Sequence, residues 1–157
     1  MNIEEFWNEF LTNTNRDKSL RFLESFHFDL RKEAANHLLD LVLTGKKKAT
    51  ASSLFVYEKT DCELPKIGDF SIITDWDGNP RCVIETSNIM IIPFHKITYE
   101  ICKREGEDET LESWQIGHRR FFIAEGKELG YEFSEDMPVI FEDFEVVYVQ
   151  DNDDGLC

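Results

Sequence analysis

The sequence predicts an α+β fold that is mainly β, with most strands antiparallel and the helices at the periphery. Strand-like segments follow one another in hairpin-like succession, and Asp77-Gly78-Asn79-Pro80 has the composition of a hairpin turn. Helical segments interrupt the strands, but their order does not follow the regular strand–helix–strand alternation that is typical of parallel sheets. Together these observations favour a small, partly closed, largely antiparallel β-barrel decorated by helices.

Apolar residues at helical spacing predict three long helices and one short one. They span residues 3–11, 30–43, 110–129 and 97–104. Gly45 and Gly130 are suited to end the second and third long helices, because glycine adopts the left-handed conformation found just beyond a helix. Asp29 is a candidate N-cap for the second helix, and Thr110 or Asp108 for the third.

Strands are expected where β-branched and aromatic residues lie between turn signals. The predicted strands are residues 21–28, 50–57, 70–74, 81–86, 89–94 and 139–149. The fourth and fifth of these form either one long bent strand or two short ones.

The length of 157 residues fits one domain, which we place at residues 1–150 and which includes the N-terminal helix. Residues 151–157 are expected to be a flexible acidic tail. No apolar run approaches the length of a membrane span, and the acidic N-terminus lacks a secretory core, so we expect a cytoplasmic protein that does not bind membranes. The four cysteines have no metal-ligand spacing, and we expect neither a metal nor a cofactor.

The formal net charge is −15 and the sequence pI is about 4.6. Nucleic-acid binding draws much of its affinity from neutralising phosphates. The acidity therefore argues against broad, nonspecific binding to duplexes. It leaves open a local basic pocket or a small neutral ligand such as a nucleoside.

The densest positive charge lies in Gly45-Lys46-Lys47-Lys48-Ala49-Thr50-Ala51-Ser52-Ser53, after a predicted helix and before a predicted strand. One interpretation is a solvated turn whose lysines suit the negative end of the helix dipole. The other is a functional site. Strand alternation places Lys46, Lys48, Thr50 and Ser52 on one face if the strand begins at Lys46, but a turn or bulge changes this parity. The sequence leaves open which lysine accompanies Thr50.

Two further groups of residues are candidates for chemistry. Glu105 and Glu107 flank a glycine just before the last helix, where acidic side chains also favour the helix dipole. On that helix, Trp114 and His118 lie four residues apart on one face, and His118 either packs in the core or lines a pocket. Arg119 is expected on a solvated face unless it guides an anionic ligand.

The sequence contains no P-loop, GxGxxG, HExxH or GxSxG motif, which argues against nucleotide hydrolysis, dinucleotide redox chemistry and zinc proteolysis. Several segments in order resemble the ASCH domain family of the PUA-like superfamily, in its longer bacterial branch. The matching segments are 41–52, Pro65-Lys66-Ile67-Gly68-Asp69, 81–86, Pro93-Phe94, Glu105-Gly106-Glu107, 111–114, 118–122 and 133–139.

The resemblance implies a small β-barrel with helices covering its ends and a cleft that contains the lysine–threonine motif. Some ASCH proteins are amidohydrolases that remove the acetyl group from N4-acetylcytidine without a metal, using a Lys-x-x-Thr pair and a glutamate. Lys47 and Thr50 match that spacing, and the glutamate is Glu105 or, with the loop aligned differently, Glu107. Other members are linked to RNA binding or RNA cleavage. The expected partner is therefore a small nucleoside or single-stranded RNA.

The chemistry expected from these residues is amide hydrolysis. Thr50 would attack the carbonyl, Lys47 with a lowered pKa would take the threonine proton, and Glu105 would orient the lysine or protonate the leaving amine. The remaining candidates for binding the substrate are Lys46, Lys48, Ser52, Glu107, His118 and Arg119. The alternative function is an RNA-binding module, with or without ribonuclease activity, and the sequence leaves the oligomeric state open.

Overall fold

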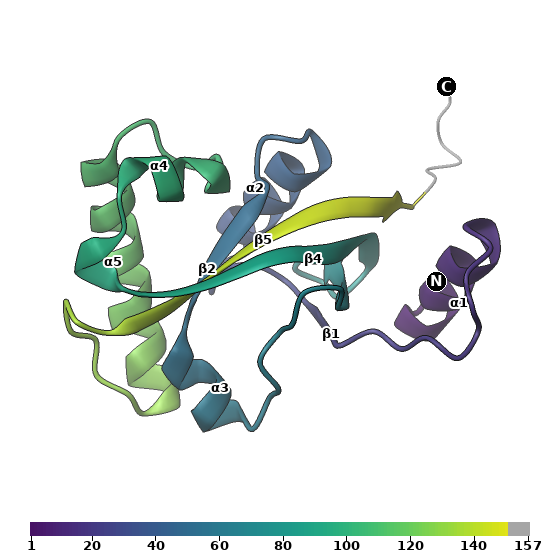
Figure 1. The fold of residues 1–157 in the computed structure, drawn as a ribbon, viewed down its shortest axis with the longest axis horizontal. Coiled ribbons are helices and arrows are strands. Elements are labelled where there is room, and N and C mark those ends of the chain that lie inside the picture. The colour runs from purple at the N-terminus through teal and green to yellow at the C-terminus, as the bar shows by residue number, and fades with distance from the viewer. Residues whose placement is uncertain (151–157) are drawn as a thin grey trace.

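The computed structural model describes residues 1–150 and contains a five-stranded sheet with the strand order β1-β3-β4-β5-β2 (Figure 1). The strands are β1 (Glu24–Phe26), β2 (Ala49–Ser53), β3 (Phe70–Thr74), β4 (Pro80–Pro93) and β5 (Pro138–Val149). The helices are α1 (Ile3–Asn13), α2 (Lys32–Leu43), α3 (Leu54–Thr60), α4 (Tyr99–Cys102) and α5 (Leu111–Leu129), with 3-10 turns η1 (Phe94–Lys96) and η2 (Lys103–Glu105).

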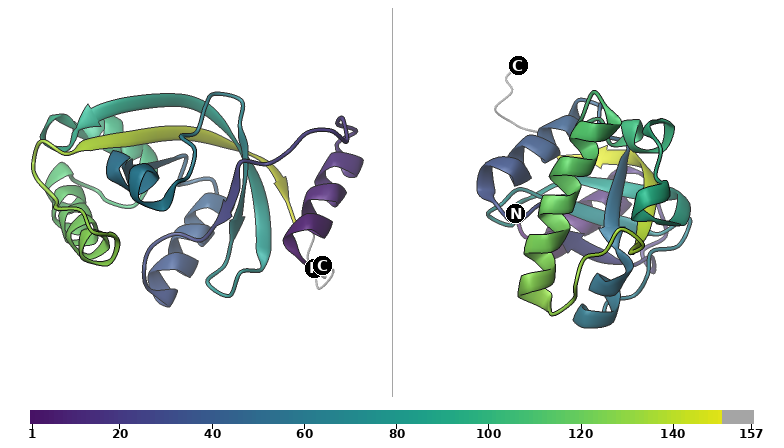
Figure 2. Two further views of the ribbon diagram at one scale, coloured as in Figure 1. Left: turned by 90° about the horizontal axis from the view of Figure 1, so that it is seen from below. Right: turned by 90° about the vertical axis from the view of Figure 1, so that its left-hand side faces the viewer.

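The sheet is mixed, because β1 runs parallel to β3 while the other three pairings are antiparallel. Its longest pairing joins β4 to β5, with register shifts at Val83/Ile84 and Thr86/Asn88. Bulges of this kind bend and twist a strand pair. The result is a curled half-barrel with β1 and β2 at its edges, which confirms the expected α+β class. In the left view of Figure 2, β4 and β5 run together above α2 and α3.

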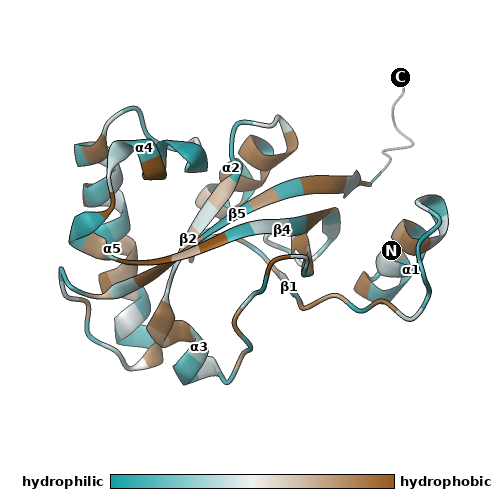
Figure 3. Ribbon diagram, in the orientation of Figure 1, coloured by the Kyte–Doolittle hydropathy of each residue, from teal (hydrophilic) through white to brown (hydrophobic). Residues whose placement is uncertain are grey.

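Helices cover the sheet at three places, each marked by a cluster of buried apolar side chains. Helix α1 packs on Phe70, Ile72 and Val83 at one end of the molecule. Helix α2 packs on a cluster that includes Ile73 and Phe144. Figure 3 shows hydrophobic segments on β4 and β5 that alternate with hydrophilic ones.

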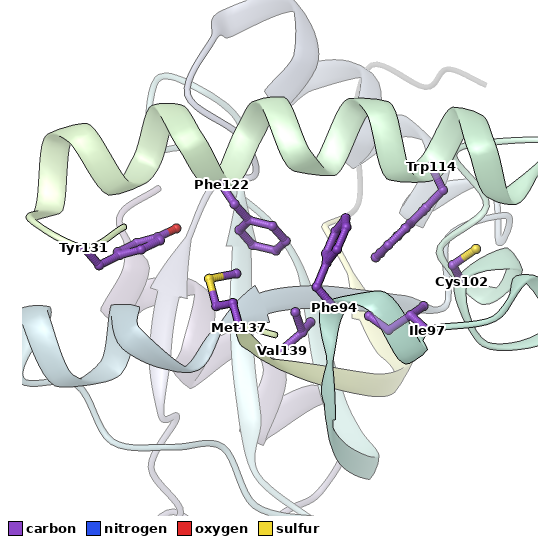
Figure 4. Close-up of a cluster of buried hydrophobic side chains, with 8 residues drawn as sticks. All are labelled: Phe94, Ile97, Cys102, Trp114, Phe122, Tyr131, Met137 and Val139. Atoms are coloured by element: carbon purple, nitrogen blue, oxygen red, sulfur yellow. The ribbon is translucent and has the colours of Figure 1, made fainter. Parts of the chain in front are cut away.

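The third cluster joins α5 to the sheet at the other end of the molecule. Phe94 and Trp114 stack here with ring centroids 5.5 Å apart, and both are fully buried. Figure 4 shows the cluster between α5 and the strands. This packing fixes one face of α5, and with it the position of His118, one turn beyond Trp114.

Several local predictions were wrong. The strand expected at 50–57 ends at Ser53, whose hydroxyl accepts a hydrogen bond from the Phe55 amide at 3.1 Å and so begins α3. Asp29 does not cap α2. It has a φ of 60°, and its side chain accepts from the Leu30 amide, while Arg31 occupies the N-cap position without a side-chain bond. The helix expected at 97–104 is replaced by two shorter elements, α4 and η2.

Two alternatives that the sequence left open are decided. Residues 80–93 form one long strand and not two short ones, and Thr110, not Asp108, caps α5 by accepting a hydrogen bond from the Ser113 amide at 3.1 Å. Gly45 and Gly130 follow their helices with φ values of 82° and 90°. The predicted flexible tail, residues 151–157, lies outside the described residues. Within residues 1–150, no helix combines the length and the apolar character needed to cross a bilayer.

Candidate active site

The lysine cluster is not uniformly solvated. Lys46 and Lys48 are exposed, whereas Lys47 is only 1% exposed. Strand β2 begins at Ala49, and the Lys48 amide already donates to the Arg104 carbonyl at 2.9 Å. The start of β2 therefore lies against η2, and the side chain of Lys47 turns inward between them.

The ammonium group of Lys47 contacts two carboxylates from the loop before α5. Its Nζ atom lies 2.9 Å from Oε2 of Glu105 and 2.6 Å from Oε2 of Glu107. The two carboxylate side chains are 2% and 17% exposed. On its other side the ammonium lies 5.2 Å from the ring centroid of Phe28, within the range of a cation–π contact. Phe28 follows β1, so this contact joins the two edges of the curled sheet.

Gly106 allows both glutamates to reach the same lysine. It has a φ of 69°, and a Cβ atom placed on it would lie 2.1 Å from the Lys46 carbonyl oxygen. Neither the left-handed backbone nor this close approach suits a residue with a side chain. The glycine lets the loop turn tightly against the backbone of the lysine segment.

Glu105 is held by α5 as well as by Lys47. Its Oε1 atom accepts a hydrogen bond from Trp114 Nε1 at 2.8 Å and lies 3.2 Å from His118 Nε2. The Nδ1 atom of His118 lies 3.0 Å from the Trp114 carbonyl oxygen, and the two rings stack with centroids 4.1 Å apart. Both nitrogens of His118 thus face oxygen acceptors, an arrangement that the doubly protonated ring satisfies.

These contacts move the pKa values of the cluster in different directions. Burial would raise the pKa of Glu105, but the charges of Lys47 and His118 outweigh it and hold that pKa well below the usual value. Burial and the neighbouring Glu105 charge raise the pKa of Glu107 to about 7, against the opposing effect of Lys47. Burial would lower the pKa of His118, but Glu105 raises it. The two adjacent carboxyls therefore differ, with one ionised and one able to exchange its proton near neutral pH.

The expectation that Lys47 has a lowered pKa was wrong. Burial does act in that direction, but Glu105 and Glu107 outweigh it, so the pKa of Lys47 is raised. The expected lowering rested on repulsion from Lys46 and Lys48, but both of these side chains are exposed to solvent. Lys47 is an ammonium ion in this site and is a poor proton acceptor.

Thr50 lies on β2, half-buried, with Glu142 as its partner across the β2–β5 pairing. Its neighbour Ala51 packs against the cluster around Trp114, so Thr50 faces the opposite side of the sheet. In the part of the chain that the structure describes, no hydrogen bond joins the Thr50 hydroxyl to Lys47, Glu105 or Glu107.

The other predicted binding residues are more dispersed. Ser52 shares the face of Thr50 and interacts with the Tyr57 hydroxyl. Arg119 lies on the surface and forms a two-point contact with Glu135, at 2.8 and 3.2 Å. A cavity of about 320 Å³ lies near the start of α5, but its lining (Thr110, Glu112, Ser113 and Ile116) contains none of the predicted residues.

Within residues 1–150, Glu105, Glu107 and His118 also form a group with a donor set for a metal, since their ligand atoms lie within 4.8 Å of one another. The Lys47 ammonium, however, already places a positive charge between the two carboxylates. The side chains thus provide their own counter-ion.

Two contacts of the site were not predicted from the sequence: the hydrogen bond from Trp114 to Glu105 and the contact of Phe28 with Lys47. The spacing of Trp114 and His118 was the available signal for the first, because residues four apart on a helix meet the same neighbour. Nothing in the sequence indicated the second, since Phe28 and Lys47 lie on different segments.

A curled α+β half-barrel with this buried site beside an edge strand defines a PUA-like barrel protein. More particularly, the chain belongs to the ASCH domain family, whose family model matches residues 24–148.

Two solved structures are similar to this chain in both fold and sequence. One is a crystal structure of a protein from Enterococcus faecalis, with 34% identity and a TM-score of 0.85, covering 94% of this chain and 88% of the other. The second is the ASCH domain from Lactobacillus crispatus, also 34% identical, with a TM-score of 0.82 and coverage of 92% and 93%. A comparison with curated proteins gives no significant match.

Proposed function

We propose that this ASCH protein is a metal-independent amidohydrolase that acts on an N-acylated pyrimidine nucleoside such as N4-acetylcytidine. The observation that carries the proposal is the buried Lys47 ammonium between two glutamates of unequal pKa. Amide hydrolysis is accelerated by a group that stabilises the developing oxyanion, such as a cation, and by a group that moves a proton near neutral pH. This cluster contains both.

The proposed roles follow from the charges. Thr50 attacks the acyl carbonyl, and its proton passes to Glu107, whose pKa of about 7 suits proton exchange. The Lys47 ammonium stabilises the negative oxygen, and Glu105 holds Lys47 in place. Glu107 returns the proton to the leaving amine, which leaves the acyl group on Thr50. Water then hydrolyses this ester and releases the acid.

The alternative is a module that binds single-stranded RNA, and the exposed Lys46 and Lys48 favour it because they flank the site on its solvent side. Lysines of this kind contact phosphates, and their contribution falls as salt rises. The net charge of −15 opposes extended RNA binding, which is why hydrolysis of a small nucleoside is the preferred proposal.

The test is to incubate purified protein with N4-acetylcytidine and to measure the release of cytidine. Glu107→Gln should lower kcat by about 10²–10⁴-fold, as expected for loss of an acid–base group. Thr50→Ala should lower it at least as much, whereas Lys46→Ala at the exposed neighbour should leave kcat within about twofold.

A different set of results would reject the proposed hydrolysis. Absence of turnover in the wild type, together with salt-sensitive binding of short RNAs that weakens in Lys46→Ala and Lys48→Ala, would reject the amidohydrolase in favour of the RNA-binding module.

A further inference from the structure

A second polar group lies on the sheet, on the face that packs against α2. We call it the inner polar cluster and define it as Glu24, Ser71, Thr86 and Glu142. Glu24 and Ser71 are partners in the β1–β3 pairing, and partners in adjacent strands share a face. Thr86 donates its hydroxyl hydrogen to Oε2 of Glu142 at 2.6 Å. The four residues come from four different strands.

This face is the one on which Thr50 lies. Glu142 and Thr50 are paired across β2 and β5, so their side chains are neighbours on the same side. Glu142 is two residues from Phe144, which packs with Phe28 in the α2 cluster, and Phe28 contacts the Lys47 ammonium. The inner polar cluster therefore adjoins the proposed reaction site.

The two carboxyl groups are largely buried without a basic partner. No salt bridge joins Glu24 or Glu142 to a cation within residues 1–150. Burial raises the pKa of Glu24, and the charge of Glu142 raises it further. Burial likewise raises the pKa of Glu142. The two carboxyls thus favour sharing a proton over carrying two full charges.

Ser71 adds a buried hydroxyl on the same face as Glu24. It is only 3% exposed, yet its hydroxyl forms no hydrogen bond within the described residues. Over the same residues, Arg16 Nε is the one fully enclosed side-chain nitrogen or oxygen without a partner. The Ser71 oxygen therefore keeps contact with solvent-accessible space. A small cavity of about 120 Å³ is lined by Glu24 together with Leu23, Cys62 and Glu63, so Glu24 is the member of the cluster that borders it.

We propose that the inner polar cluster recognises the amino-pyrimidine edge of the ligand, the adjacent exocyclic N–H and ring nitrogen found in cytosine. The choice of a pyrimidine rests on the proposed function. Thr86 occupies one oxygen of Glu142 and leaves the other available. An ionised carboxylate accepts the exocyclic N–H, and a protonated carboxyl donates to the ring nitrogen. Ser71 supplies a further hydroxyl that needs a partner.

The same pairing rejects uracil. The Thr86 hydroxyl donates to Glu142 and favours its ionised form over that of Glu24. Uridine presents a carbonyl oxygen where cytidine presents an N–H donor, so this oxygen would face the Glu142 carboxylate. A site built to hydrogen-bond one group discriminates strongly against an analogue that leaves its buried polar atoms unpaired. The cluster would thus orient the base while Thr50 and Lys47 act on the acyl group.

The experiment is calorimetric titration of the protein with cytidine and with uridine, which needs no turnover. We expect cytidine to bind at least about tenfold more tightly than uridine. Glu142→Gln should weaken cytidine binding about tenfold and remove the preference for cytidine over uridine. Ser71→Ala and Glu24→Gln should each weaken cytidine binding. Glu145→Gln is the matched control, because Glu145 lies on the same strand but is exposed. Circular dichroism verifies that each variant is folded.

Several results would overturn the proposal. They are equal affinity for the two nucleosides, no binding of cytidine at millimolar concentration, or unchanged cytidine affinity in Glu142→Gln. A Glu142→Gln variant with normal affinity and a lost kcat would assign Glu142 to proton transfer instead. A preference for cytidine without any hydrolysis would retain the recognition site and reject the proposed enzyme. Hydrolysis of N4-acetylcytidine with an unchanged KM in Glu142→Gln would retain the proposed enzyme and reject the recognition site.

Discussion

The Nζ atom of Lys47 lies 2.9 Å from Oε2 of Glu105, and both residues are 1% exposed. Two opposite charges from segments 58 positions apart thus share one buried site. Each compensates the other for the loss of water, so removal of either leaves an unpaired charge in a poorly solvated place. This relationship makes the candidate site a structural element as well as a chemical one.

Lys47→Ala should therefore destabilise the protein by about 3–5 kcal/mol, because it leaves Glu105 buried without its cation. Urea unfolding measures this free energy, and Lys46→Ala at the exposed neighbouring lysine should change it by less than about 0.5 kcal/mol. Equal effects of the two substitutions would contradict the pairing. Because loss of activity in Lys47→Ala then has two causes, Thr50 and Glu107 are better positions for testing catalysis.

Stability should depend on pH through Glu107. Its pKa is about 7 in the folded protein and 4.5 as the reference value, so between these pH values the folded state binds more protons. The free energy of unfolding should therefore fall as pH rises through this window, by at most about 1.4 kcal/mol per pH unit from this group. Unfolding measured from pH 4.5 to 8 provides the test.

Glu107→Gln provides the comparison for that pH dependence, because the amide cannot titrate. Glu24 and Glu142 also have raised pKa values and contribute with the same sign, so the difference between the two proteins is the quantity to follow. The substitution should flatten the profile between pH 4.5 and 7. Identical profiles for the two proteins would show that Glu107 does not titrate in this range.

Gly106→Ala should disrupt the site without removing any of its functional groups. The added Cβ would meet the Lys46 carbonyl at 2.1 Å, and the backbone is already in the left-handed region, so we expect a loss of more than about 1 kcal/mol. Gly45→Ala is a matched control, since Gly45 also has positive φ but has open space around it. Thermal unfolding should show a larger loss for Gly106→Ala. A smaller loss would contradict the close approach.

Deletion of residues 1–14 should lower thermal stability, because α1 covers Phe70, Ile72 and Val83. Trp7→Ala tests the same packing with a single substitution. Trp7 is 2% exposed, and truncating a buried aromatic side chain typically costs about 3–5 kcal/mol. Binding of a dye for apolar surface should rise in the deletion. An unchanged melting temperature would show that α1 packs only weakly on the sheet.

The sequence alone determined the class of fold and much of the local structure. Apolar periodicity identified α1, α2 and α5, and the run at 70–74 matches β3 because a buried strand leaves a strong local signal. It did not determine where β2 ends. The β-branched and aromatic residues after Ser53 favour a strand, but the Ser53 cap and packing of Phe55 and Val56 against the α5 cluster place them in a helix.

The candidate site shows the same division. The sequence singled out Lys47, Thr50, Glu105 and Glu107 through the resemblance and the local charge pattern. Only the tertiary structure decided that Lys47 is buried while Lys46 and Lys48 are exposed, and that its pKa is raised. The physical reason is that a pKa depends on burial and on charges nearby in space. The two glutamates that hold the Lys47 proton, and the Glu142 that adjoins Thr50, come from segments far away in the chain.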